Sequence, residues 1–143
     1  MRVLLALVLL FQLASPAFAA MSLIEKWRNA SLLNAQEWRS LVSGKTLTYS
    51  IDAYDLYREQ YDRYSNNVTA QFNNGECIYG RWEAQNDYFC YYWKGSETVC
   101  SRHARFGKEL LINFVEDGQN TDEFQLITDI SDTPLSCGAS IMS

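Results

Sequence analysis

From residue 45 onward, apolar and polar positions alternate with the period of a half-buried β-strand. In the first such segment, 45–51, Leu47, Tyr49 and Ile51 fall on one face. Similar segments follow between short polar or glycine-containing stretches, and we expect strands at 54–64, 68–72, 76–83, 88–94, 97–106, 109–115 and 122–128. Seven or eight strands without intervening helices predict a mainly β fold. We expect an antiparallel meander that forms a small barrel or a folded-over sheet, since closure removes exposed edges.

The segment 54–64 fits two periods. Its tyrosines recur at helical spacing, but Tyr57, Glu59 and Tyr61 also share one face of a strand. Because tyrosine favours strands, we assign a strand here.

Two short helices are predicted before the strands, each by a capping box. Ser22-Leu23-Ile24-Glu25 begins a first helix that runs through Trp27. Asn34-Ala35-Gln36-Glu37 begins a second, and Gly44 ends it in a left-handed conformation. We expect these helices to cover one end or one edge of the sheet.

Residues 1–19 have the three-part pattern of a secretory signal peptide. Arg2 provides the positive start, and residues 3–11 form an unbroken apolar run. Small residues, Ala17 and Ala19, then occupy the −3 and −1 positions of a signal peptidase site. The apolar run is far shorter than the roughly 20 residues that a membrane-spanning helix needs, so we expect cleavage rather than anchoring.

Cleavage after Ala19 or Ala20 would leave 20–143 as a single domain, exported to the periplasm or secreted. No later stretch is long and apolar enough for a transmembrane segment. The chain has 17 acidic and 12 basic residues and a net charge of −5. We therefore expect no nucleic-acid partner, because the phosphate backbone demands a positively charged surface.

All four cysteines lie in the part that we expect to be exported, where an even number predicts two disulfides. Their spacings do not match those of zinc sites, and the chain has one histidine, so we expect no metal site. If Lys94-Gly95-Ser96 is a three-residue hairpin loop, facing residue numbers sum to 190, which places Cys90 opposite Cys100. Cys77 would then pair with Cys137.

The sequence contains no motif for catalysis or cofactor binding. Ser43-Gly44-Lys45-Thr46 resembles the end of a phosphate-binding loop, but the earlier glycine that such a loop needs is Arg39. His103 lies mid-strand without a neighbouring nucleophile pattern, and most carboxylates fall at predicted turns. We expect no cofactor and a non-enzymatic binding domain. Two alternatives stay open: a small hydrolase that uses carboxylates or His103, and a purely structural envelope protein.

One predicted sheet face is rich in aromatic residues. With a two-residue turn at Gln85-Asn86 and the sum of 190 across the next hairpin, this face extends over three strands. Its candidate ligand-binding residues are Trp82, Tyr91, Trp93, His103 and Arg105. An aromatic wall with one cationic end would suit a small amphipathic or anionic ligand inside a barrel, and an envelope protein is the other partner that we consider. The alternative is that these rings form the core, with Gly80 leaving room for a neighbouring ring.

Several segments of the chain together give it a recognisable pattern. They are Gly44-Lys45-Thr46-Leu47-Thr48-Tyr49, Tyr57-Arg58-Glu59-Gln60-Tyr61, Gly75-Glu76-Cys77-Ile78-Tyr79-Gly80-Arg81-Trp82, Cys90-Tyr91-Tyr92-Trp93, Cys100 and Leu135-Ser136-Cys137. Over residues 37–138 the sequence resembles a group of small, uncharacterised exported proteins of alphaproteobacteria. The resemblance implies a periplasmic all-β domain with disulfides, and it implies no activity.

Overall fold

The computed structural model describes residues 20–137. The expected signal peptide, residues 1–19, lies outside the described residues. Neither helix within 20–137 has the length and apolar character needed to cross a membrane.

Both predicted helices are present, and both begin with the predicted capping boxes. Helix α1 spans Leu23–Arg28 after Ser22, and helix α2 spans Ala35–Val42 after Asn34. In each box the capping side chain accepts a hydrogen bond from the backbone of a glutamate three residues later, whose carboxylate binds back to the cap. Gly44 follows α2 with a φ of 71°, so the chain leaves the helix in the left-handed conformation expected there.

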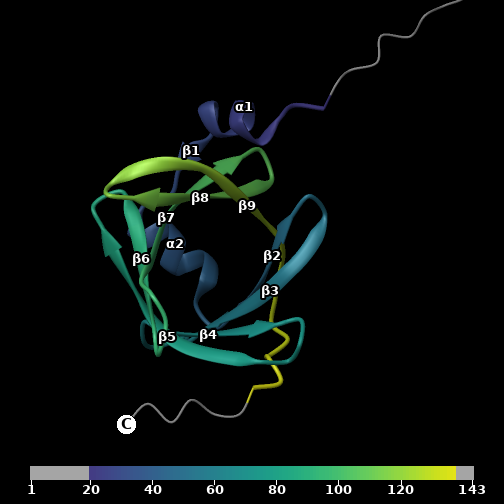
Figure 1. The fold of residues 1–143 in the computed structure, drawn as a ribbon, viewed down its shortest axis with the longest axis vertical. Helices are drawn as coiled ribbons and strands as arrows, with labels where there is room; N and C mark the ends of the chain where they lie inside the picture. Colours follow the sequence, from purple (N-terminus) through teal and green to yellow (C-terminus); the bar gives the residue numbers. More distant parts are fainter. Residues whose placement is uncertain (1–19, 138–143) are drawn as a thin grey trace, which may run out of the picture.

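Residues 20–137 form nine strands, and eight of them, β2 to β9, follow one another with the antiparallel pairing of a meander. The nine strands are β1 (Ser31–Leu32), β2 (Thr46–Ile51), β3 (Tyr54–Tyr61), β4 (Asn67–Phe72), β5 (Cys77–Gln85), β6 (Tyr88–Trp93), β7 (Val99–Phe106), β8 (Glu109–Glu116) and β9 (Gln119–Ser131). Each strand from β2 to β9 pairs with its sequence neighbours, and β9 pairs back with β2. The fold is therefore a closed eight-stranded antiparallel barrel (Figure 1).

Strand β1 was not predicted and lies outside this closed ring. It pairs with the end of β7, where Ser31 faces Arg105 and Leu32 faces Ala104. Strand β6 pairs with the opposite end of β7, near Cys100, so β1 occupies a stretch of edge that β6 leaves free. A two-residue strand carries no periodic signal, which explains why the sequence pattern did not reveal it.

Helix α2 fills one end of the barrel and appears inside the ring of strands in Figure 1. Trp38 of α2 is fully buried and packs against Tyr61 of β3, Phe89 of β6 and His103 of β7. Helix α1 lies outside the ring, where Trp27 packs edge-on against Phe124 at 5.8 Å. The expectation that the helices cover one end or one edge of the sheet is met by α2, which covers one end, while α1 packs against the outside of the strands.

The register confirms the hairpin analysis around the disulfides. Cys90 faces Cys100, the pairs on either side also sum to 190, and the structure contains both expected bridges, Cys90–Cys100 and Cys77–Cys137. Between β5 and β6 the turn is at Asn86-Asp87 rather than Gln85-Asn86, because Gln85 pairs with Tyr88. The residue numbers of facing pairs therefore sum to two more than expected. Because a change of two leaves odd and even positions on the same faces, the same residues still point inward.

Strand β3 ends at Tyr61, three residues before the predicted end at 64. The carboxylate of Asp62 accepts hydrogen bonds from the backbone N–H groups of Tyr64, at 2.7 Å, and Ser65, at 2.8 Å. This side-chain turn takes the backbone out of the sheet.

Candidate ligand-binding cavity

The barrel interior is filled at one end and hollow at the other. Trp38 fills the end where β3 finishes and β6 begins, and beyond it lies a cavity of about 280 Å³. All eight barrel strands, β2 to β9, contribute residues to its walls. Strand β9 contributes one residue, Gln125. Exposed residues at the far end, Phe72, Ser96 and Val99, also line it, so the cavity reaches the surface opposite α2.

Most of the cavity wall is aromatic or aliphatic. Strands β3, β4, β6, β7 and β8 contribute alternate residues, as the period of a β-strand requires, and β2, β5 and β9 contribute one residue each. The aromatic and aliphatic side chains are Tyr49, Tyr57, Ala70, Phe72, Ile78, Tyr91, Trp93, Val99, Ile112 and Phe114. Tyr49 stacks on Tyr57 with ring centroids 4.9 Å apart, and Tyr91 stacks on Trp93 at 6.1 Å.

Trp93 takes its place in the wall because Gly80 faces it. A Cβ atom on Gly80 would lie 2.7 Å from Cε3 of the Trp93 ring and 2.7 Å from the backbone oxygen of Tyr92. Real Cβ atoms do not approach backbone atoms so closely, so only glycine allows this ring to lie over β5. The sequence-based expectation that Gly80 makes room for a neighbouring ring is confirmed.

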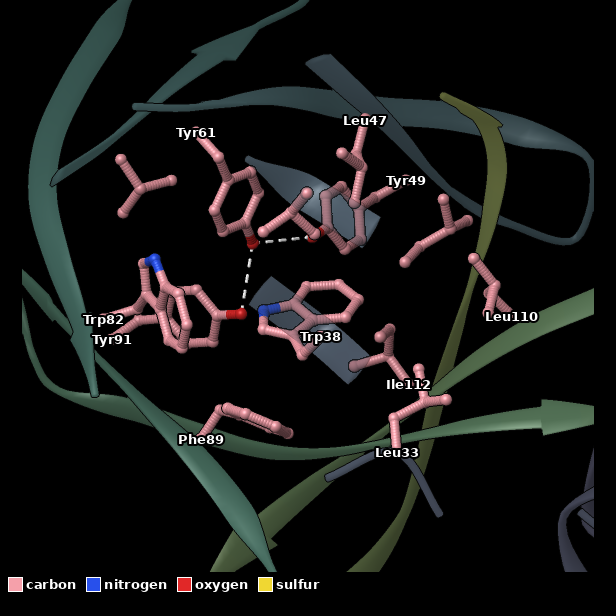
Figure 2. Packing of buried hydrophobic residues seen from close by; sticks show 13 residues of the cluster. Leu33, Trp38, Leu47, Tyr49, Tyr61, Trp82, Phe89, Tyr91, Leu110 and Ile112 are labelled. Carbon is pink, nitrogen blue, oxygen red and sulfur yellow. Dashed lines mark hydrogen bonds between the residues drawn. The ribbon is translucent and has the colours of Figure 1, made fainter. Parts of the chain in front are cut away.

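A cluster of hydroxyl groups surrounds a carboxyl at the floor of the cavity. The hydroxyl of Tyr61 donates to Oε2 of Glu59 at 2.7 Å and also hydrogen-bonds to Tyr49, at 3.0 Å, and Tyr91, at 3.1 Å. Figure 2 shows the bonds among the three tyrosines, which converge from three different strands above Trp38. All of these side chains are buried.

Burial controls the protonation of this cluster. Removal from water raises the pKa of Glu59 from its ordinary value of 4.5 to about 7, although the hydroxyls of Tyr61 and Tyr49 oppose the shift. Burial, followed by the nearby charge of Glu59, raises the pKa values of Tyr49, Tyr61 and Tyr91 well above 10. The phenols therefore stay neutral, and Glu59 is poised to gain or lose a proton near neutral pH.

On the opposite wall, His103 is also buried and neutral. Burial lowers the pKa of His103 from 6.5 to about 3. Its Nε2 lies 3.0 Å from Oγ of Ser101, a hydrogen bond whose direction depends on the histidine tautomer. Its Nδ1 has no hydrogen-bond partner among residues 20–137. The ring is held instead between Phe89, stacked at 4.5 Å, and Trp38, at 3.8 Å.

A second polar pair joins neighbouring walls. The hydroxyl of Tyr57 donates to Oε1 of Gln125 at 2.7 Å. Burial raises the pKa of Tyr57 above its ordinary value, so this phenol is neutral as well. Such a small number of fixed polar groups in a mostly apolar cavity is typical of sites that orient a small ligand.

Three of the five candidate residues from the sequence line the cavity. Tyr91, Trp93 and His103 do so, whereas Trp82 and Arg105 do not. Trp82 points inward but is packed beside α2, with the guanidinium of Arg39 4.8 Å from its ring.

The expected cationic end of the wall is absent from the cavity. Arg105 is exposed beside α2, near Ser40, because β7 continues past the helix that fills this end of the barrel. His103, the other basic residue of the pattern, is kept uncharged by burial.

The sequence pattern did not single out Glu59, the residue with the most distinctive setting. The alternation of inward and outward residues along β3 could have identified it, since Glu59 falls on the inward face between Tyr57 and Tyr61. An ionisable group at an inward position of a strand must be paired, neutral or functional.

The described part of the chain contains no group of three or more His, Cys, Asp or Glu side chains placed to hold a metal ion. Glu59 is the one carboxylate in the cavity wall of residues 20–137. Most glycoside hydrolases use two carboxyl groups that flank the substrate, and the described cavity wall supplies one.

The fold and cavity define a class: an eight-stranded antiparallel barrel that encloses a small, mostly apolar cavity. Barrels of this size are just wide enough either to be filled by side chains or to hold one small ligand. Comparisons with protein-family models, with curated proteins and with solved structures found no match to this chain.

Proposed function

We propose that this protein is an exported binding protein, periplasmic or secreted, whose barrel cavity holds one small, largely apolar molecule. The observation that carries the proposal is the cavity of about 280 Å³ between the buried cluster of Glu59 and the barrel mouth. This volume lies just below the roughly 300–1,000 Å³ found for ligand pockets, so it suits a single ring or a short chain.

The proposed location rests on the cysteines and the N-terminal pattern. Two disulfides indicate an oxidising compartment outside the cytoplasm. The apolar run and small-residue site in residues 1–19 supply the expected route there.

A cavity-filling substitution tests the binding function. Ala70 is buried in the cavity wall, and Ala70→Leu would occupy part of the volume. Ala84, an exposed alanine of β5 outside the cavity, gives the matched control Ala84→Leu. Calorimetric titration with single-ring compounds that carry neutral, cationic or anionic head groups should show binding to the wild type and Ala84→Leu, and weaker binding to Ala70→Leu. Absence of binding by the folded wild type, or equal binding by Ala70→Leu, would refute the proposal.

The contact between Ser101 and His103 supports a second candidate, an esterase. A serine hydroxyl 3.0 Å from an imidazole nitrogen has the spacing of the nucleophile and general base in serine hydrolases. Two features weigh against it: no acidic group among residues 20–137 orients Nδ1, and the pKa of His103, about 3, is far below that of an effective base. Hydrolysis of p-nitrophenyl acetate that disappears in Ser101→Ala would favour the esterase, whereas unchanged background hydrolysis would favour binding alone.

A further inference from the structure

The cavity contains one group that can carry charge near neutral pH. Glu59 is buried, with 5% of its surface exposed, and it reaches the cavity from β3. The described wall includes no lysine or arginine, and His103 across from it is neutral. Any charge on the described cavity wall is therefore negative.

A buried carboxylate is unfavourable unless another group compensates its charge. The hydroxyl of Tyr61 gives Glu59 a hydrogen bond, but a neutral donor does not balance a full negative charge. A glutamine at this position would keep a hydrogen-bond acceptor without that penalty. A glutamate at this position is therefore compensated best by a partner that brings a positive charge into the cavity.

The walls around this carboxyl offer the surfaces that cations prefer. The stacked pairs Tyr49–Tyr57 and Tyr91–Trp93 come from two sides of the cavity, and Phe72 and Phe114 lie in the wall. Ring faces attract a cation within about 6 Å, most strongly where water is excluded. Aromatic walls with one carboxylate form a site for an organic cation rather than for an anion.

We infer that the ligand is a small primary amine on an aromatic or short aliphatic group, whose ammonium pairs with Glu59 while its apolar part lies against the aromatic walls. This inference rests on the proposed binding function and specifies the chemistry of its ligand. It replaces the anionic ligand suggested by the sequence, because Arg105 lies outside the cavity.

The inference requires a particular dependence on pH. The titratable groups that face Glu59 are the phenols of Tyr49 in β2, Tyr57 and Tyr61 in β3 and Tyr91 in β6, and none of them changes charge near pH 7. Simple amines remain protonated up to about pH 10. The affinity for an amine should therefore rise as the pH rises through about 7, where Glu59 loses its proton.

Three compounds of matched size test the inference: 2-phenylethylamine, 2-phenylethanol and 3-phenylpropanoate. We expect the wild type at pH 8 to bind the amine at least about tenfold more tightly than the alcohol, and the carboxylate most weakly. At pH 5.5 the advantage of the amine should largely disappear. Calorimetric titration measures all three affinities.

The variant Glu59→Gln should lose the preference for the amine and still bind the alcohol. Glu123→Gln, at an exposed glutamate of β9 outside the cavity, should behave as the wild type. Tryptophan fluorescence checks that each variant is folded.

The outcomes separate the two proposals. If the alcohol or the carboxylate binds as tightly as the amine, or if Glu59→Gln keeps the preference, the cation inference is wrong and the binding function stands. If none of the three binds the folded wild type and the wider set of single-ring compounds also fails, both are wrong.

Discussion

Replacement of Glu59 by glutamine should change how stability depends on pH, because Glu59 and His103 titrate in opposite senses when the chain folds. Burial raises the pKa of Glu59 from 4.5 to about 7 and lowers the pKa of His103 from 6.5 to about 3. The folded state therefore keeps a proton on Glu59 that the unfolded chain releases. It also excludes a proton from His103 that the unfolded chain binds.

The signs and magnitudes follow from the linkage between proton binding and folding. Below pH 4.5 the stability contributed by neutral Glu59 is fully present, and it is lost as the pH rises to about 7. At about 1.4 kcal/mol per pH unit, the rise in the pKa from 4.5 to about 7 amounts to about 3.5 kcal/mol. His103 acts in the opposite direction, since its contribution is lost as the pH falls from 6.5 toward 3. Between about pH 4.5 and 6.5 the two slopes cancel in the wild type.

Glu59→Gln removes the contribution of Glu59 to the pH dependence of the free energy of unfolding, so the contribution of His103 is no longer cancelled. Equilibrium unfolding in urea, followed by tryptophan fluorescence under non-reducing conditions from pH 5 to 8, measures the effect. Relative to the wild type, the variant should gain about 2 kcal/mol in free energy of unfolding between pH 5 and 6.5, and about 2.5 kcal/mol between pH 5 and 8. Glu123→Gln, at an exposed position, should follow the wild type across the range. A difference between wild type and Glu59→Gln that stays constant with pH would refute the reasoning, because the carboxyl would then titrate alike in both states.

Three further predictions concern packing and cross-links, and urea unfolding measures each. Gly80→Ala should lower the free energy of unfolding by about 1–3 kcal/mol and weaken ligand binding, because the added methyl displaces the Trp93 ring; unchanged stability and binding would contradict this. Trp38→Ala should cost about 3–5 kcal/mol, since it empties the helix-filled end of the barrel; a loss below 1 kcal/mol would show that this end repacks. Removal of the Cys77–Cys137 bridge by serine substitution should cost about 4 kcal/mol, and removal of Cys90–Cys100 about 3 kcal/mol, because the first closes the longer loop; the reverse order would contradict the loop-closure argument.

Much of the barrel could be predicted from the sequence because its information is local. The turns that need a left-handed residue mark the hairpins, and Gly75, Gly95, Gly107 and Gly118 all have positive φ values. The alternation of side chains then fixes which residues point inward, and a turn misplaced by one residue at Asn86 leaves that division unchanged. The pairing of Cys90 with Cys100 follows from the same local rule.

The features that decide function depend on contacts between distant segments. The periodicity predicts helix α2, but not that Trp38 enters the barrel or which end it fills. Closure of the sheet depends on the pairing of β9 with β2, which are far apart in the sequence. The residues of the hairpin turns do not determine such a long-range pairing. The environment of Glu59 depends on both events, since burial raises its pKa only after the barrel is closed and capped.

The two interpretations of the aromatic face each apply to one half of the barrel. Near α2, Trp82 and Phe89 are core residues that pack against Tyr61 and the helix. Farther along the same face, Trp93 has no helix beneath it and borders the cavity. One short helix with one large side chain fills only part of an eight-stranded barrel, so the remaining volume must be occupied by other side chains, by water or by a ligand. A buried acid at the boundary between the filled and the hollow halves is unfavourable for either kind of core, and a cationic ligand is the occupant that would compensate it.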